Sequence, residues 1–255
     1  MIVRDLVAKT SVDAGPSESD TIVISRDGKA LATFDKTGIS LHPIAGGDAR
    51  QIRIGESIRR LWEWVRPTLI TASTNSTGVI GHSAQNASDG RVVAVAVNVE
   101  TSKVLTILDS PSSRYLGHAR LSPDGRWMAL MDWFSADRAR VIVVPYDGVT
   151  TATMSQVIPI TDGQTVAEET VWSADGNTLY LVSETDGYRC VWSRRVDPRT
   201  IQPMGPLTAV AHFHRARQQI VSTVASAQRI DISPAGLIFA MDERRGNIWM
   251  ATVKR

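Results

Sequence analysis

Three carboxylates, Glu63, Glu169 and Asp231, lie in or next to short apolar segments of the chain. Carboxylates of this kind, if they face a common channel, could act as acid and nucleophile, or as acid and base, in glycoside hydrolysis. That chemistry needs two carboxyl groups about 5–9 Å apart, a separation that spacing along the chain does not fix. The other interpretation, which we favour, is that these side chains line a water-filled channel or cap turns. They are therefore only candidates for catalysis.

Two histidines, His212 and His214, alternate with Phe213, so in an extended segment both imidazoles face the same side. With His118 they could hold a metal, but none of the histidines has a recognised ligand spacing. The single cysteine, Cys190, is expected to be a small buried apolar residue. The sequence therefore predicts no metal site.

Other catalytic and cofactor-binding motifs are not found in the sequence. There is no Gly-x-Ser-x-Gly nucleophile elbow, phosphate loop or dinucleotide fingerprint, so we expect no cofactor. The 28 basic and 26 acidic residues are scattered, which argues against a nucleic-acid partner. No apolar run is long enough to span a membrane, and the first residues lack a signal-peptide core, so no membrane insertion is expected.

The elements that must position these residues come from a repeated unit. A turn of the form Ser-x-Asp-Gly recurs at residues 25–28, 122–125 and 173–176, with Ala235 replacing the Asp at residues 233–236. A short apolar segment precedes each turn, and two more follow it. The gap between the first two turns is about twice the period of a four-stranded unit, so a degenerate copy is expected there, beginning at residues 61–73.

Five copies of an antiparallel four-stranded unit predict an all-β propeller, with six blades as the alternative count. We expect a single domain over residues 1–255, with the N-terminal segment pairing with the last copy to close the ring. The expected blades span residues 16–55, 56–109, 110–161, 162–214, and 215–255 plus 1–15.

The repeat also resembles a known family. The unit begins with Ser-Pro-Asp-Gly, continues with an apolar strand and a loop, and ends with Asn-Ile-Trp or a related sequence. This unit is similar to the TolB-type bacterial propeller repeat. The resemblance implies a propeller fold in a cytoplasmic or periplasmic part of a bacterial protein, although the compartment stays unknown. The segments SETDGYRCVW and ERRGNIWMA resemble blades of bacterial multidomain proteins, which makes a sensor segment of a signalling protein one alternative.

Alternate turns of an antiparallel unit lie on the same side, so the loops joining second and third strands share one face with the connections between blades. Binding residues are expected on that face. Those near the channel mouth are Asp20, Arg59, His118, Glu168 or Glu169, and Arg229, and the loop aromatics are Trp133, Phe134 and Tyr188. We expect a non-catalytic binding or scaffolding propeller with a protein, peptide or carbohydrate partner, and a glycosidase as the rival function.

Overall fold

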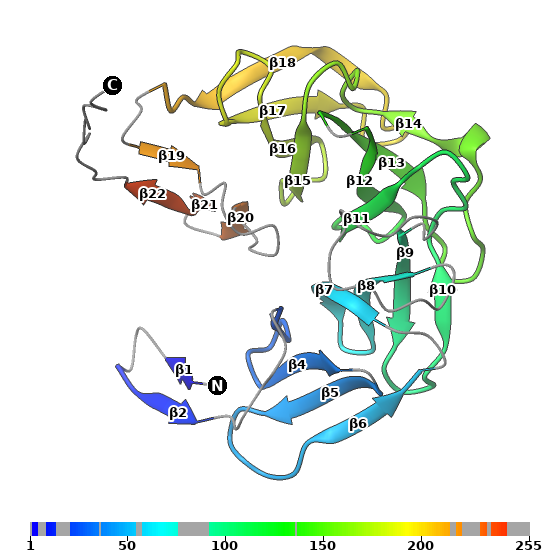
Figure 1. Cartoon of the computed structure of the whole chain (residues 1–255), viewed down its shortest axis with the longest axis vertical. Helices are drawn as coiled ribbons and strands as arrows, with labels where there is room; N and C mark the ends of the chain where they lie inside the picture. Colours follow the sequence, from blue (N-terminus) through cyan, green and yellow to red (C-terminus); the bar gives the residue numbers. More distant parts are fainter. Residues whose placement is uncertain are drawn as a thin grey trace, which may run out of the picture.

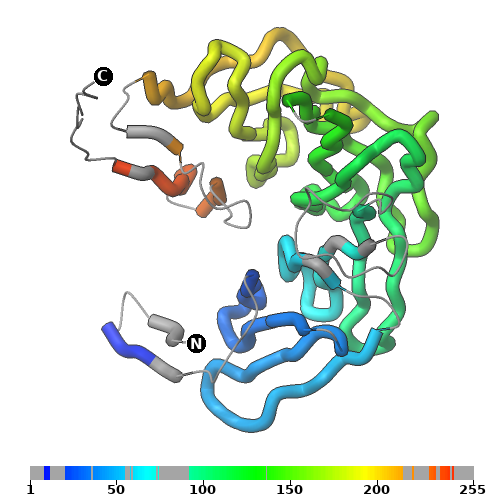
Figure 2. The backbone as a smooth tube through the Cα atoms, in the orientation of Figure 1, coloured from blue at the N-terminus to red at the C-terminus, as the bar shows by residue number. Residues whose placement is uncertain are grey.

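A computed structural model describes residues 2–4, 9–13, 21–35, 37–54, 58–75, 92–135, 137–214, 218–220, 230–233 and 236–243. Regular structure in these ranges is β apart from one short 3-10 turn at Met154–Gln156. The strands form successive antiparallel sheets around an arc, as Figure 1 and the backbone tube in Figure 2 show. The predicted all-β propeller architecture is confirmed.

Four blades are described strand by strand, each a meander of four antiparallel strands. The first blade contains β3 (Val23–Ile24), β4 (Ala30–Asp35), β5 (Gly38–Pro43) and β6 (Arg50–Arg53). The second contains β7 (Ile58–Arg66), β8 (Leu69–Asn75), β9 (Val92–Asn98) and β10 (Val104–Thr106). The expected degenerate copy is therefore a complete blade, with residues 76–91 outside the described part.

The next two blades are the best formed. The third contains β11 (Tyr115–Leu121), β12 (Trp127–Ser135), β13 (Arg138–Pro145) and β14 (Ile158–Pro159). The fourth contains β15 (Ala167–Trp172), β16 (Thr178–Ser183), β17 (Cys190–Val196) and β18 (Pro203–Ala211). In Figure 1 the first strand of each blade lies toward the centre of the arc and the fourth lies at its rim.

The first and the last described strands, β1 (Ile2–Arg4) and β22 (Met241–Glu243), lie at the two ends of the arc (Figure 1). In the described residues, β1 (Ile2–Arg4) pairs with β2 (Ser11–Asp13), and β20 (Ile230–Ser233) pairs with β21 (Gly236–Phe239). A further ladder joins β19 (Gln218–Ile220) to β22 (Met241–Glu243). The ladders between described strands include none from the N-terminal segment to the last copy, so closure of the ring by that segment stays a prediction.

Apolar side chains fill the spaces between neighbouring blades. Four buried clusters follow one another along the arc, between blades one and two, two and three, three and four, and four and the last copy. Trp172, Trp192 and Trp249 recur at strand positions of the repeat, which predicts that they are core residues between blades, and the first two are buried in the third cluster. Trp249, predicted to be a third such core residue, lies outside the described residues. The stacked sheets give a rigid support for their connecting loops.

Candidate functional site

The strand order defines two faces of the arc. The turn face carries the connections between first and second strands, which include the Ser-x-Asp-Gly turns. The loop face carries the connections between second and third strands, and the chain passes from one blade to the next on the same side. The strand β12 therefore has Trp127 at its turn-face end and Trp133 near its loop-face end.

A row of aromatic rings crosses blades two and three toward the loop face, and we call these four residues the aromatic row: His118, Trp62, Tyr115 and Trp133. His118 stacks on Trp62, with ring centroids 4.2 Å apart. Edge-to-face contacts then join Trp62 to Tyr115 at 6.3 Å and Tyr115 to Trp133 at 6.5 Å. The first two residues are buried, whereas Tyr115 and Trp133 keep part of their surface exposed.

The backbone of the innermost strands is irregular where this row begins. His118 in β11 and Glu169 in β15 have positive φ angles of 52° and 49°. The ladder register shifts across both positions, between Gly117 and Arg120 and between Glu168 and Val171. A β-bulge re-aims the side chains around it. Two neighbouring blades thus share one local distortion, and in both the bulged residue is buried.

Next to Trp133, a partly buried ion pair fixes the edge of the loop face. Asp132 is 2% exposed and accepts a hydrogen bond from Arg140 Nε at 2.8 Å and another from the Ser113 hydroxyl at 2.5 Å. Arg140 lies opposite Asp132 in the β12–β13 ladder, and its guanidinium carbon is 5.6 Å from the ring centroid of Phe134. Both predicted loop aromatics of the third blade are therefore held by neighbouring contacts.

The fourth blade has a comparable charged network. Arg189 bridges two carboxylates, Glu168 on the innermost strand β15 and Glu184 in the loop after β16, at 2.8 Å each. This pairing connects the inner strand to the loop between β16 and β17. It also orients the start of that loop beside the predicted binding residue Tyr188, whose side chain is exposed.

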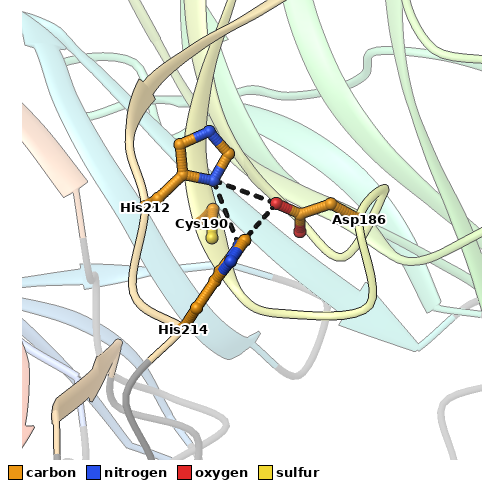
Figure 3. A group of neighbouring side chains, drawn as sticks. All are labelled: Asp186, Cys190, His212 and His214. Carbon is orange, nitrogen blue, oxygen red and sulfur yellow. Dashed lines mark hydrogen bonds and ion pairs between the residues drawn. The ribbon is translucent and has the colours of Figure 1, made fainter.

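Around Tyr188 the same loop approaches the end of β18. The ring of Tyr188 stacks on His214 at 4.4 Å, and His214 Nε2 lies 2.8 Å from Asp186 Oδ2. Figure 3 shows the four side chains that meet there, which we call the His–Cys–Asp cluster: Asp186, Cys190, His212 and His214. One ligand-type atom from each residue lies within 4.8 Å of the other three. Such donors could hold a metal ion, in contrast to the sequence prediction.

The electrostatics of this cluster have identifiable causes. Burial raises the pKa of the Cys190 thiol, and the nearby charge of Asp186 adds to the rise. Burial would also raise the pKa of Asp186, but hydrogen bonds from His214 and from the Tyr188 backbone outweigh it, and the pKa is lowered. An ionised Asp186 therefore faces the two imidazoles.

The three catalytic candidates lie on three different blades. Glu63 on β7 is 3.3 Å from Arg26 and 3.8 Å from Arg120, so it takes part in ion pairs with the flanking blades. Glu169 is buried on β15, and Asp231 is exposed on β20. The strand β11 lies between the strands of Glu63 and Glu169 (Figure 1). A catalytic pairing of these residues stays an untested prediction.

Other predicted binding residues have different outcomes. His118 and the loop aromatics of the third blade are placed as described above. Asp20 and Arg229 lie outside the described residues, and Arg59 is described only as a backbone position in β7. His118 is not part of the His–Cys–Asp cluster, so it is not the partner of His212 and His214 that the sequence suggested.

A hollow of about 170 Å³ lies on the opposite, turn face between blades three and four. The turns at residues 122–124 and 174–176 line it, together with Trp127, Pro198 and Ile201. It is therefore separate from both the aromatic row and the His–Cys–Asp cluster. In the described residues, no helix is long and apolar enough to cross a membrane.

Comparison with known proteins identifies the fold. No protein-family model matches the chain, and no curated protein does. Solved structures do match: TolB from Acinetobacter baumannii is 15% identical with a TM-score of 0.60, over 96% of this chain and 54% of that protein. Puromycin hydrolase is 16% identical with a TM-score of 0.58, over 86% of this chain and 36% of the hydrolase.

An oligogalacturonate lyase in complex with manganese also matches, at 17% identity and a TM-score of 0.58, over 79% of this chain and 57% of the lyase. The chain thus spans between about a third and somewhat over half of these three proteins. At such identities the likeness shows the fold alone. The chain has a TolB-type β-propeller fold, as the repeat resemblance implied.

Proposed function

We propose that the protein is a non-catalytic binding propeller that receives a protein or peptide on its loop face. The observation that carries the proposal is the aromatic row, which runs from a buried stack to the partly exposed side chains of Tyr115 and Trp133. Aromatic side chains anchored in this way lose little conformational entropy when a partner covers them, and they are favoured interface anchors.

The charged surroundings of the row favour a peptide-like partner. The pair of the buried Asp132 with the partly exposed Arg140 holds a guanidinium next to Phe134, and the exposed Tyr188 lies on the next blade. Polar groups around an aromatic centre are the usual composition of a protein interface. A rigid propeller with loops of this kind positions contacts without supplying reaction chemistry.

The experiment selects peptides from a displayed random library on immobilised wild-type protein and then measures their affinity for a Trp133→Ala variant. Because a central aromatic anchor contributes about 2 kcal/mol or more, we expect the dissociation constant to rise by roughly 30-fold. The melting temperature should change little, since Trp133 is partly exposed at the end of its strand.

Trp127→Ala is the matched control, because Trp127 lies on the same strand but at the turn-face end. The selected peptides should bind this variant as they bind the wild type. Loss of binding in Trp127→Ala but not in Trp133→Ala would place the partner on the turn face and contradict the proposal. If the library yields no binders and the protein captures an oligosaccharide on a glycan array, the partner is a carbohydrate and not a peptide.

A further inference from the structure

The His–Cys–Asp cluster is assembled by the register of one blade rather than by a local motif. In the ladder between β17 and β18, Val191 pairs with Ala211, so Cys190 at the start of β17 lies beside the residues that follow β18. The backbone N–H of Phe213 donates to Cys190 Sγ at 3.3 Å. Asp186 comes from the loop that leads into β17. Four residues separated by up to 28 positions therefore meet at one corner of the loop face (Figure 3).

Three of the four donor atoms converge on a common point. Asp186 Oδ2 lies 3.0 Å from His212 Nδ1 and 2.8 Å from His214 Nε2, and these two nitrogens are 3.1 Å apart. Each of these nitrogens carries at most one hydrogen, and an ionised carboxylate oxygen carries none. The three atoms form a triangle with three short edges. Two hydrogens can provide hydrogen bonds along only two of these edges. A cation between the three atoms would instead accept a lone pair from each.

The fourth donor is the thiol of Cys190, which is fully buried and lies within 4.8 Å of the other three donor atoms. An amide hydrogen bond to sulfur, here from Phe213, is the kind of outer contact that orients and stabilises a metal-bound thiolate. A nearby divalent cation also reverses the effect of burial on a thiol, because a coordinating sulfur loses its proton.

Neighbouring rings hold the two imidazoles in place. The Tyr188 ring stacks on His214 at 4.4 Å, and Trp192 contacts His212 edge-on at 5.5 Å. Phe213, between the two histidines, packs against Phe239 in the apolar cluster next to the last copy. The partly buried Phe213 therefore anchors the segment against that cluster, and the two histidines on either side of it point the other way.

We propose that the His–Cys–Asp cluster binds one Zn²⁺ ion as a structural site. One sulfur, two imidazole nitrogens and one carboxylate oxygen are zinc ligands, and four protein ligands give a closed tetrahedral site. Ligand atoms around tetrahedral zinc are about 3.4 Å apart, so the three edges of 2.8, 3.0 and 3.1 Å would each lengthen by about 0.3–0.6 Å, and the sulfur, within 4.8 Å of the others, would move toward them. The thiolate selects zinc over manganese, magnesium and calcium, which favour oxygen ligands. The ion would tie the β16–β17 loop to the end of β18, independently of the proposed partner binding.

Metal binding by the whole chain tests this inference. After treatment with a chelator and desalting, the protein is titrated with Zn²⁺ in competition with a chromophoric zinc indicator, and with Co²⁺ followed by absorption. We expect one Zn²⁺ per chain and a higher melting temperature with zinc, because an ion that binds only the native state stabilises it. Bound Co²⁺ should show the visible bands of tetrahedral coordination and a thiolate-to-cobalt charge-transfer band. Mn²⁺ should bind much more weakly.

Three variants decide whether this cluster is the site. His214→Gln should weaken zinc binding by at least about 100-fold, since even outer contacts of metal ligands contribute 10- to 100-fold. Its side chain is about half exposed, so the fold without metal should be retained. Cys190→Ser should remove the charge-transfer band. His42→Gln, on β5 of the first blade, is the control and should bind zinc as the wild type does.

Several results would overturn the inference. These are wild-type protein that binds no zinc, zinc affinity that is unchanged in His214→Gln, and a cobalt spectrum that keeps its thiolate band in Cys190→Ser. Mn²⁺ binding as tight as Zn²⁺ binding would also contradict the proposed role of the thiolate.

Discussion

At the scale of single residues, the Ser-x-Asp-Gly turns are built by one pair of side chains. In the turn of the fourth blade, the Ser173 hydroxyl donates to Asp175 Oδ1 at 2.6 Å and accepts the backbone N–H of Thr178 at 3.0 Å. The turns of the first and third blades repeat this arrangement with serine-to-aspartate distances of 2.7 and 2.6 Å. The glycine that ends each turn has φ near +70°, which glycine adopts without strain.

The serine hydroxyl gives this turn a pH dependence. It is the largest cause that lowers the pKa of Asp175 below its usual value near 4. A carboxyl with a depressed folded pKa stabilises the fold above its unfolded pKa, and this contribution is lost as pH falls through the folded pKa. Ser173→Ala should therefore lower the free energy of unfolding by about 1 kcal/mol at pH 7 and by less near pH 3. Urea unfolding followed by circular dichroism measures both values.

The last copy provides a matched control for the serine substitution, because Ala235 replaces the turn aspartate there. Ser233 donates to the Gly236 carbonyl at 3.2 Å, and the alanine at position 235 offers no turn carboxylate to it. Any effect of Ser233→Ala should be the same at pH 7 and pH 3. A Ser173→Ala effect that is equally independent of pH would show that the carboxylate is not coupled to the turn.

At the scale of the element, the aromatic row depends on the missing side chain of Gly117, at the edge of the bulge in β11. A Cβ atom at Gly117 would lie 2.5 Å from a ring carbon of Tyr115, which is closer than non-bonded carbon atoms approach. Gly117→Ala should therefore push Tyr115 out of its contacts with Trp62 and Trp133. We expect a loss of roughly 1–3 kcal/mol in the free energy of unfolding, as for other overpacked positions.

A double-mutant cycle separates this effect from backbone effects. In a Tyr115→Ala background the added methyl group meets no ring, so Gly117→Ala should be close to neutral or slightly stabilising. Denaturant unfolding of the four proteins gives the coupling energy. If the alanine costs the same in both backgrounds, the contact between Gly117 and Tyr115 does not limit the substitution.

The elements also show why the candidate site could be only partly predicted from sequence. The loop after β16 and the alternating His212 and His214 are visible as local patterns. Cys190 and Asp186 complete the cluster with these histidines because β17 pairs with β18. This pairing joins residues about 20 positions apart. Cys190 therefore looked like an ordinary core residue, and the prediction of no metal site rested on local spacing alone.

At the scale of the whole molecule, the repeat made the architecture predictable. Recurring turns mark equivalent positions, so the degenerate second copy could be located although its turn is shortened to Pro67 and Thr68. Each expected fourth strand in the first four blades is present, including the short β14. Ring closure does not follow from the repeat, because pairing between the two ends of the chain is not a repeated local pattern. It was expected from the removal of exposed sheet edges and stays a prediction.

The blade interfaces predict how the molecule unfolds. Leu130 on β12 of the third blade is fully buried in the cluster between blades two and three, where it packs with Trp62 and Ala94 of the second blade. Leu130→Ala should lower the free energy of unfolding by about 2–5 kcal/mol through lost burial and a cavity. Because both sheets share the cluster, amide exchange should accelerate in β9 as well as in β12, by about 100-fold for a 3 kcal/mol loss.

Native-state hydrogen exchange measures these rates. The control Val210→Ala, at an exposed position of β18, should leave the exchange rates within about threefold of the wild type. Faster exchange confined to the third blade would mean that neighbouring blades open separately, and the stacked sheets would then not form one cooperative unit.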